Sequence, residues 1–249
     1  MDKISAIGFD LFNTLIFSDQ HTLAEAMGNL VGCLREEGFS LDQESFTQAY
    51  RETTLRFFEE CQRTGIETHN RFWISSTLQA LGFSVEPDDP PISRAVDAYF
   101  SAFFPHCHLV PGTLEMLHLL RKDYPLGLLS NFTHPPAARK ILDLLGLAPL
   151  FGVILISGEM GFRKPHPRVY EALISGFRVE AGRILYVGDD PVPDIFGAER
   201  AGLRPVWTTY VKDRGLSRVP LGADSYAEAP GPHIPRISSW EELLSMLHK

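Results

Sequence analysis

The sequence predicts an α/β protein: a Rossmann-like parallel-sheet core with a helical-bundle module inserted near its beginning. Three observations favour this fold. Residues 4–9 form an apolar run typical of a fully buried strand. Residues 20–105 show helical spacing of apolar side chains and no alternating strand pattern. Further along, short apolar runs alternate with helical segments, as in a parallel sheet covered on both faces. We therefore assign residues 1–17 and 109–249 to the core and 18–108 to the helical module.

Composition limits the classes of function. The chain has 249 residues, 44% hydrophobic and 22% charged, enough for a core with an inserted module. A formal net charge of −8 argues against a nucleic-acid partner. Three widely spaced cysteines indicate reduced thiols rather than a disulfide framework. We see no signal peptide and no apolar run near the length of a membrane span, so we expect a cytoplasmic protein without a membrane partner.

The helical module is expected to contain four helices. Gly38 is a plausible C-cap of the first, and Asp42 is a candidate N-cap of the second. Prolines within residues 86–91 are expected to separate the third helix from the fourth. Residues 106–108 (His-Cys-His) lie between two prolines, and we interpret them as a hinge rather than a metal site. The expected helices span residues 21–37, 42–58, 70–81 and 93–104.

The rest of the core is expected to alternate strands and helices. Thr113 is a candidate N-cap, and Ser238 or Ser239 is a candidate cap of the last helix. Residues 211–236 hold much Gly and Pro and are expected to run over the surface. The expected strands are 126–129, 153–156, 184–187 and 205–208, and the expected helices are 113–122, 136–145, 167–177, 194–201 and 240–247.

The first strand ends in a carboxylate, Asp10, and chemistry in open α/β sheets gathers just beyond the carboxyl ends of strands. Thr14 is expected to hydrogen-bond local backbone and brace the turn. Taken alone, Asp10 is either a cap or a reactive group, and capping is the commoner case.

Three later segments favour the reactive interpretation. The run 126–131 ends in Ser130 and Asn131, and the segment 161–165 carries Lys164 before a proline. The run 184–190 ends in an acidic turn, to which Asp194 adds a further carboxylate. A nucleophile, a hydroxyl, a lysine and an acidic loop in this order resemble the haloacid dehalogenase superfamily, which uses D-x-(D)-x-T, Ser/Thr, Lys and G-D-D or G-D-x₄-D motifs. The resemblance spans most of the chain outside the module and implies that the module is a four-helix cap.

The resemblance implies a role for each residue. Asp10 is the expected nucleophile, because a positioned and shielded carboxylate can form a covalent intermediate. Ser130 and Asn131 are expected to hold the leaving anion. Lys164 is expected to bind phosphate and offset the charge of Asp10, while its neighbour Arg163 is expected to face solvent. The plainer alternatives are a strand-end cap, a capping serine and a surface lysine.

The acidic turn is expected to bind Mg²⁺, which prefers oxygen ligands. Asp10 and Asp189 are the expected direct ligands, and the resemblance adds the main-chain carbonyl of Phe12. Asp190 or Asp194 is expected to hold waters or outer contacts. The alternative for Asp194 is that it only caps the following helix.

Phe12 departs from the family's phosphatases, which carry there a second Asp that protonates the leaving oxygen. We expect the Phe12 side chain to meet the substrate, as do Ser130, Asn131 and Lys164. The family's metal-free dehalogenases carry Tyr at this position, but they lack the acidic turn. We weigh the acidic turn more and expect a Mg²⁺-dependent phosphatase of a small phosphate ester. The alternatives are a 2-haloacid dehalogenase and a catalytically silent binding protein. The sequence assigns neither a particular substrate nor an oligomeric state.

Overall fold

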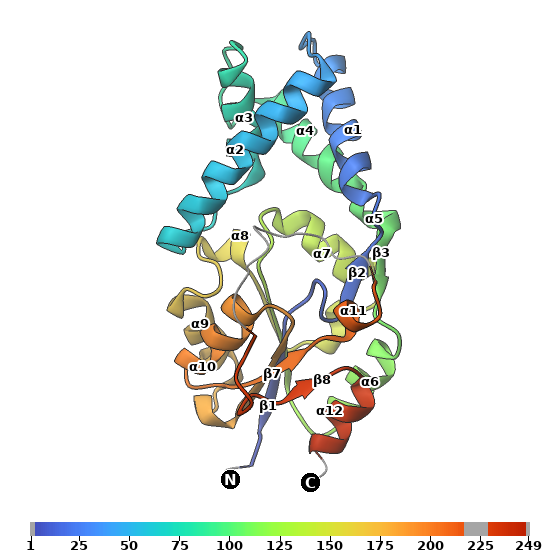
Figure 1. The fold of residues 1–249 in the computed structure, drawn as a ribbon, viewed down its shortest axis with the longest axis vertical. Helices are drawn as coiled ribbons and strands as arrows, with labels where there is room; N and C mark the ends of the chain where they lie inside the picture. Colours follow the sequence, from blue (N-terminus) through green and yellow to red (C-terminus); the bar gives the residue numbers. More distant parts are fainter. Residues whose placement is uncertain (1–2, 217–228, 248–249) are drawn as a thin grey trace.

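A parallel β-sheet forms the centre of the protein (Figure 1). The computed structural model describes residues 3–216 and 229–247. Within these residues the sheet has six strands in the order β5-β4-β1-β6-β7-β8, and all neighbouring strands are parallel. The predicted α/β class and parallel core are therefore confirmed. The strands are β1 (Ala6–Phe9), β4 (Leu126–Ser130), β5 (Val153–Ile156), β6 (Ile184–Gly188), β7 (Arg204–Thr208) and β8 (Arg236–Ile237).

Side chains of the central strands alternate between two apolar layers, because successive residues of a strand point to opposite faces. Ile7 and Phe9 of β1 belong to a large cluster shared with α6 (Thr113–Leu120), α7 (Pro135–Leu144) and α12 (Trp240–Leu247). Ala6 belongs to a second cluster with α9 (Pro167–Phe177) and α10 (Gly197–Arg200). Figure 1 shows these two groups of helices on opposite sides of the sheet. Short helical segments complete the core: α8 (Ser157–Met160), η1 (Ala148–Leu150), η2 (Ala181–Arg183) and η3 (Pro191–Phe196).

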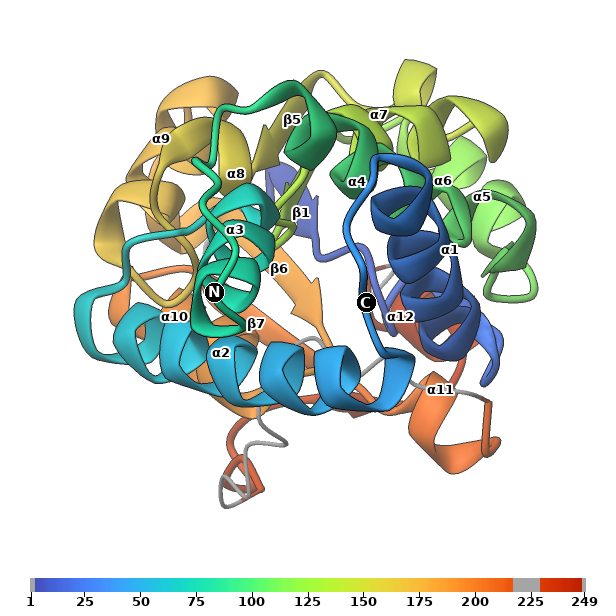
Figure 2. The ribbon, with the colours of Figure 1, turned by 90° about the horizontal axis from the view of Figure 1, so that it is seen from above.

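A helical module lies beyond the carboxyl ends of the strands (Figures 1 and 2). The segment assigned to this module, residues 18–108, contains the helices α1 (Thr22–Glu36), α2 (Gln43–Thr64), α3 (Asn70–Ala80), α4 (Pro90–Ser101) and α5 (Phe103–His106). The predicted N-cap of α2 is confirmed, since Asp42 Oδ2 accepts a hydrogen bond from Ser45 N at 2.9 Å. The prolines do not interrupt a helix here. Pro90 begins α4 three residues before its predicted start, at a position where the missing N–H does no harm.

The core and the module are joined by a two-stranded antiparallel ribbon that the sequence analysis did not predict. Its strands are β2 (Ile16–Ser18) and β3 (Cys107–Leu109), each too short for alternation to be visible. The predicted boundaries of the module, at 17/18 and 108/109, fall inside this ribbon. A ring nitrogen of His106 and a ring nitrogen of His108 each lie 3.1 Å from Asp19 Oδ2.

The start of α6 and the segment before α12 differ from what the sequence predicts. Thr113 does not cap its helix, because its hydroxyl donates to the Leu15 carbonyl at 3.2 Å, and the N-cap position is Gly112 with φ of 80°. Part of the segment expected to run over the surface is regular, because α11 (Tyr210–Asp213) and β8 overlap its two ends. Residues 217–228 lie outside the described residues.

The cysteines Cys33, Cys61 and Cys107 are free, as predicted. Among the described helices, none has both the length and the apolar composition to cross a bilayer.

Candidate active site

The predicted motifs meet at one edge of the sheet. Asp10 directly follows β1, Ser130 ends β4, and Asp189 directly follows β6. These strands are neighbours in the sheet, so parallel pairing brings their carboxyl ends together. Lys164 reaches the same place from the loop before α9, and its side chain is 2% exposed. The structure therefore gathers the four sequence motifs into one buried site.

Lys164 is the centre of this site. Its Nζ lies 2.6 Å from Asp10 Oδ1, 2.7 Å from Asp194 Oδ1 and 3.1 Å from the Tyr186 hydroxyl. Burial alone would lower the pKa of Lys164, but the charges of Asp10 and Asp194 outweigh it and hold this pKa above its ordinary value. Burial also raises the pKa of Asp10 to about 6, against the opposing effect of Lys164. At neutral pH the site thus contains an ionised Asp10 carboxylate paired with the Lys164 ammonium.

Asn131 holds the main chain of Lys164. Its Oδ1 accepts from Lys164 N at 2.7 Å, and its Nδ2 donates to Lys164 O at 3.1 Å. Both polar atoms of the side chain are therefore engaged within the protein, whereas the sequence analysis expected Asn131 to meet the substrate. Ser130 is 1% exposed at the end of β4. Its contact with a substrate anion stays a prediction.

Three carboxylates form a compact group at the site. Asp10, Asp189 and Asp194 each offer an oxygen, and these atoms lie within 4.8 Å of one another. Asp190 is not part of this group. Its Oδ1 accepts from Val192 N at 3.1 Å and so begins the helical turn η3.

The capping role considered for Asp194 therefore belongs to Asp190, because the helix begins at Pro191, before Asp194. Asp194 instead uses both carboxylate oxygens, one toward Lys164 and the other toward Asp190 N at 3.0 Å. Oxygen-only donors at this spacing suit a hard cation such as Mg²⁺.

The Phe12 side chain packs between the core and the helical module and is 2% exposed. Its ring stacks on Phe132 of the core, with centroids 5.3 Å apart and an interplanar angle of 11°. It meets the edge of Phe103 of α5 at 6.4 Å. An apolar ring thus stands at the position where the sequence resemblance implies an aspartic acid in phosphatases.

The expectation that Thr14 braces the nearby turn is wrong, because its buried hydroxyl has no hydrogen-bond partner among the described residues.

Polar contacts hold the helical module onto the core beside the site, and the sequence analysis missed them. Glu67, between α2 and α3, accepts from Ser157 Oγ at 2.5 Å and pairs with Arg163 at 3.4 Å. Gly65 O accepts from Arg163 N at 3.0 Å. The Arg163 side chain is 12% exposed, so the expectation that it faces solvent is wrong. No sequence signal points to Glu67, because its partners are distant along the chain.

Two histidines and a carboxylate form a second set of contacts between the module and the core, which we call the histidine clasp: His69, His134 and Asp97. His69 Nδ1 accepts from Arg71 N at 3.2 Å, so the ring proton of neutral His69 lies on Nε2. That atom is 2.9 Å from His134 Nδ1, and His134 Nε2 is 3.3 Å from Asp97 Oδ1. The chain of donors and acceptors is complete only when both rings are neutral.

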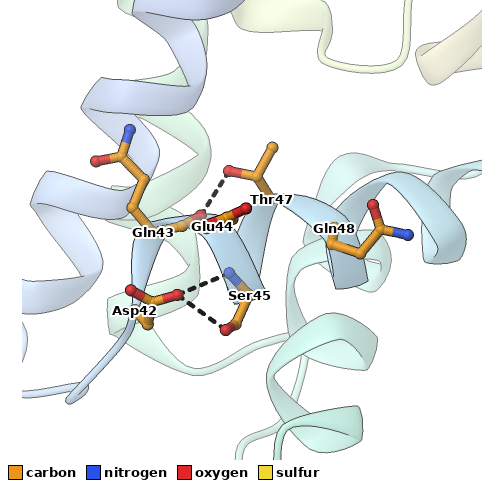
Figure 3. A pocket seen from close by; sticks show the side chains of 6 residues that line it. All are labelled: Asp42, Gln43, Glu44, Ser45, Thr47 and Gln48. Carbon is orange, nitrogen blue, oxygen red and sulfur yellow. Dashed lines mark hydrogen bonds between the residues drawn. The ribbon is translucent and has the colours of Figure 1, made fainter.

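One hollow lies elsewhere, at the beginning of α2 (Figure 3). All the residues that line this hollow lie in the first turns of α2 or directly before it. This end of α2 is the one farther from the sheet (Figure 1). Two of the side chains that line it, Asp42 and Ser45, are engaged in the hydrogen bonds that cap α2.

The fold and site together define the chain as a hydrolase. Residues 4–202 match the family model described as haloacid dehalogenase-like hydrolase, and the chain belongs to this family. It is 32% identical over 211 residues to glyceraldehyde 3-phosphate phosphatase of Pyrococcus abyssi, covering 84% of this chain and 83% of that one. It is 29% identical over 239 residues to the enzyme of the same name from Pyrococcus furiosus, covering 95% and 92%.

Among solved structures, the chain is similar to the 2-haloacid dehalogenase of Pseudomonas syringae pv. tomato. The TM-score is 0.72 at 20% identity, and the match covers 98% of both chains. At this identity the likeness concerns the fold alone.

Proposed function

We propose that this hydrolase is a Mg²⁺-dependent phosphatase that acts on a small phosphate ester through a phosphoryl group carried on Asp10. One observation carries the proposal: the compact group of Asp10, Asp189 and Asp194, of which Asp10 and Asp194 contact the buried Lys164. The relatives named phosphatases support the same class of reaction. We also propose that the helical module acts as a cap, with residues 18–108 as its extent.

The charges of the site favour a divalent cation. The carboxylate oxygens of Asp10, Asp189 and Asp194 lie within 4.8 Å of one another. Like charges this close repel one another, and a divalent cation between them would relieve the repulsion. The carboxylates of Asp10, Asp189 and Asp194, with the Phe12 carbonyl that the family resemblance implies, would hold Mg²⁺. When bound, the ion supplies positive charge that favours phosphate oxygens at the site.

Asp10 is the proposed nucleophile. One of its oxygens forms a bond to phosphorus while the bond from phosphorus to the ester oxygen breaks, and the leaving oxygen takes up a proton from solvent water. A water molecule then attacks phosphorus and gives up a proton to solvent while the bond between phosphorus and the Asp10 oxygen breaks, which releases inorganic phosphate and restores the Asp10 carboxylate. Lys164, 2.6 Å from Asp10, orients the carboxylate and offers positive charge to the phosphate.

Phe12 limits the choice of substrate, because it cannot donate a proton to the leaving group. Esters whose leaving oxygen needs little protonation are therefore the better substrates. General acid catalysis is worth roughly 10²–10⁴-fold, so its loss is felt most with alkyl leaving groups.

The same residue favours a second candidate, a metal-free 2-haloacid dehalogenase. An aromatic side chain at position 12 is a feature of those enzymes, and halide leaves without a proton. In that reaction Asp10 displaces halide from carbon, and water hydrolyses the resulting ester. A third candidate is a catalytically silent protein that uses the module to bind a partner.

A substrate screen separates these candidates. Phosphate esters and 2-haloacids are incubated with the protein, with and without Mg²⁺, beside an Asp10→Asn control. We expect release of phosphate only with Mg²⁺ and only from the unchanged protein. Release of halide without Mg²⁺ would establish the dehalogenase instead. Absence of turnover on both panels would favour the silent protein.

A further inference from the structure

We propose that Tyr186 is a positioning residue whose hydroxyl holds the Lys164 ammonium in place for the reaction. Tyr186 lies in β6 and is fully buried. Its hydroxyl oxygen is 3.1 Å from Lys164 Nζ and also 3.1 Å from the Leu129 carbonyl in β4. The role in catalysis rests on the phosphatase proposed above, whereas the role in positioning concerns Lys164 itself.

The hydrogen-bond inventory assigns each proton. A tyrosine hydroxyl has one proton, and a carbonyl oxygen can only accept, so the Tyr186 proton goes to Leu129 O. The hydroxyl oxygen therefore presents a lone pair to Lys164. An ammonium has three protons, and their acceptors are Asp10, Asp194 and Tyr186. Three acceptors in different directions define one position for Nζ.

A neutral third acceptor has a distinct advantage. It satisfies the last N–H of a buried ammonium without adding a further negative charge that would repel an incoming phosphate. Without the Tyr186 hydroxyl, one buried N–H of the Lys164 ammonium would lack an acceptor. The ammonium would then be held only by Asp10 and Asp194, and its position would be less well defined. Tyr186 thus sets the position of the charge that Lys164 offers to substrate.

The sequence makes room for this hydroxyl at a neighbouring strand. Gly8 of β1 pairs in register with Tyr186. A Cβ at Gly8 would lie 2.9 Å from Tyr186 Cδ2, so only glycine lets the ring lie across β1. The Tyr170 ring meets the Tyr186 ring edge-on at 6.1 Å and an angle of 80°, which restricts its rotation. The ring can therefore reach from β6 across β1 to β4.

Nuclear magnetic resonance of the lysine ammonium tests the positioning without using any substrate. Protein labelled with ¹⁵N-lysine should show a slowly exchanging ammonium signal that disappears in Lys164→Met. We expect Tyr186→Phe to shift or broaden this signal. Tyr210→Phe should leave it unchanged, because Tyr210 is another buried tyrosine but stacks on Trp240. No such signal in the unchanged protein, or the same signal in Tyr186→Phe, would overturn the proposal.

A kinetic double-mutant cycle on para-nitrophenyl phosphate with Mg²⁺ tests the role in catalysis. Loss of a hydrogen bond to a charged group should lower kcat roughly 10- to 100-fold in Tyr186→Phe, with KM changed less. In a Lys164→Met background the same substitution should have no further effect. Equal losses in both backgrounds would mean that Tyr186 acts only through packing.

Two controls keep the outcome clear. Melting temperatures are compared first, and if Tyr186→Phe does not fold, Gly8→Ala displaces the ring and gives the same readouts. If the unchanged protein hydrolyses no phosphate ester, the proposed function fails, and the ammonium signal alone decides the role of Tyr186.

Discussion

At the scale of single residues, Phe12 is a buried packing side chain next to the candidate active site. Asp10, two residues earlier, keeps its contact with Lys164. The Phe12 ring is stacked on Phe132 and touches Phe103 of the module. The side chain at position 12 therefore contributes to packing between module and core, where the family's phosphatases have a proton donor.

Phe12→Asp should restore a proton donor at the expense of stability. Burying a carboxyl among aromatic rings should lower the melting temperature. Where the variant remains folded, kcat/KM should rise most for an alkyl phosphate, by up to the roughly 10²–10⁴-fold of general acid catalysis, and less for an aryl phosphate. Both substrates are measured with Mg²⁺.

The matched control is Phe12→Asn, which loses the same packing and gains no acid. It should show the lower melting temperature without the gain in rate. A folded Phe12→Asp with no gain on either substrate would contradict the account of position 12.

The sequence predicted the residues that directly follow strands and missed those that depend on distant partners. Asp10 and Asp189 could be located because parallel strands bring their carboxyl ends to one edge. The contact of Tyr186 with Lys164 depends on the ring crossing Gly8, and the Asn131 side chain binds main chain 33 residues away. Neither relation leaves a local pattern. The roles of Asp190 and Asp194 were harder to distinguish, because the residue that caps the helical turn depends on where that turn begins, and it begins at Pro191.

At the scale of elements, the histidine clasp connects α3 and α4 of the module to the start of α7. His69 is the N-cap residue of α3, Asp97 lies within α4, and His134 precedes α7. His134 also stacks on Phe100 at 4.9 Å, which continues the aromatic packing around Phe12. The clasp therefore links the contact between the module and the core to the protonation state of two rings.

The clasp should weaken in acid. Burial lowers the pKa of His69 to about 4, with His134 and Arg71 adding to the effect. Burial also lowers the pKa of His134, although Asp97 opposes this. Because the folded pKa lies below the unfolded value of about 6.5, the stabilisation is complete above pH 6.5 and is lost as pH falls toward 4.

His69→Asn provides the measurement, because Asn keeps a capping oxygen and does not titrate in this range. The loss of unfolding free energy between pH 7.5 and pH 5 should be smaller in this variant by roughly 1 kcal/mol, allowing for solvent screening of a half-buried ring. His118→Asn, at an exposed site on α6, should behave as the unchanged protein. Identical pH dependence in His69→Asn and the unchanged protein would refute the clasp.

Most elements could be predicted because their apolar periodicity is local. The predicted core strands and three of the four predicted module helices appear within three residues of their expected ranges, whereas α2 ends at Thr64 rather than at residue 58 and β8 was not predicted. The β2–β3 ribbon could not be predicted, since three-residue strands carry too little pattern and pair across 89 residues at Ser18 and Cys107. The early start of α4 follows from Pro90, which begins a helix as readily as it ends one.

At the scale of the whole molecule, the helical module covers the carboxyl ends of the strands (Figures 1 and 2). The carboxylate group of Asp10, Asp189 and Asp194 lies at these strand ends. A cation that binds only the folded protein stabilises all of it, by RT ln(1 + [L]/Kd). The stability of the whole chain therefore reports occupation of the carboxylate group.

Mg²⁺ should raise the melting temperature. At about one hundred times Kd the gain is about 2.7 kcal/mol, or roughly 5–10 °C for a chain of this size. Asp189→Asn should abolish the shift, because Asp189 belongs to the carboxylate group. Asp190→Asn is the matched control: it should retain the shift, because its carboxylate caps η3 instead. An equal shift in both variants, or none in the unchanged protein at millimolar Mg²⁺, would contradict the proposed ligands.

The most direct test of the account is to look for a phosphoryl group on Asp10. The protein is mixed with para-nitrophenyl phosphate and Mg²⁺, quenched in acid within one turnover, digested, and analysed by mass spectrometry. We predict one added phosphoryl group on the peptide that contains Asp10, and none in Asp10→Asn or without Mg²⁺. Turnover of the ester by Asp10→Asn at the rate of the unchanged protein, or a phosphoryl group on another residue, would contradict the central claim that Asp10 is the nucleophile.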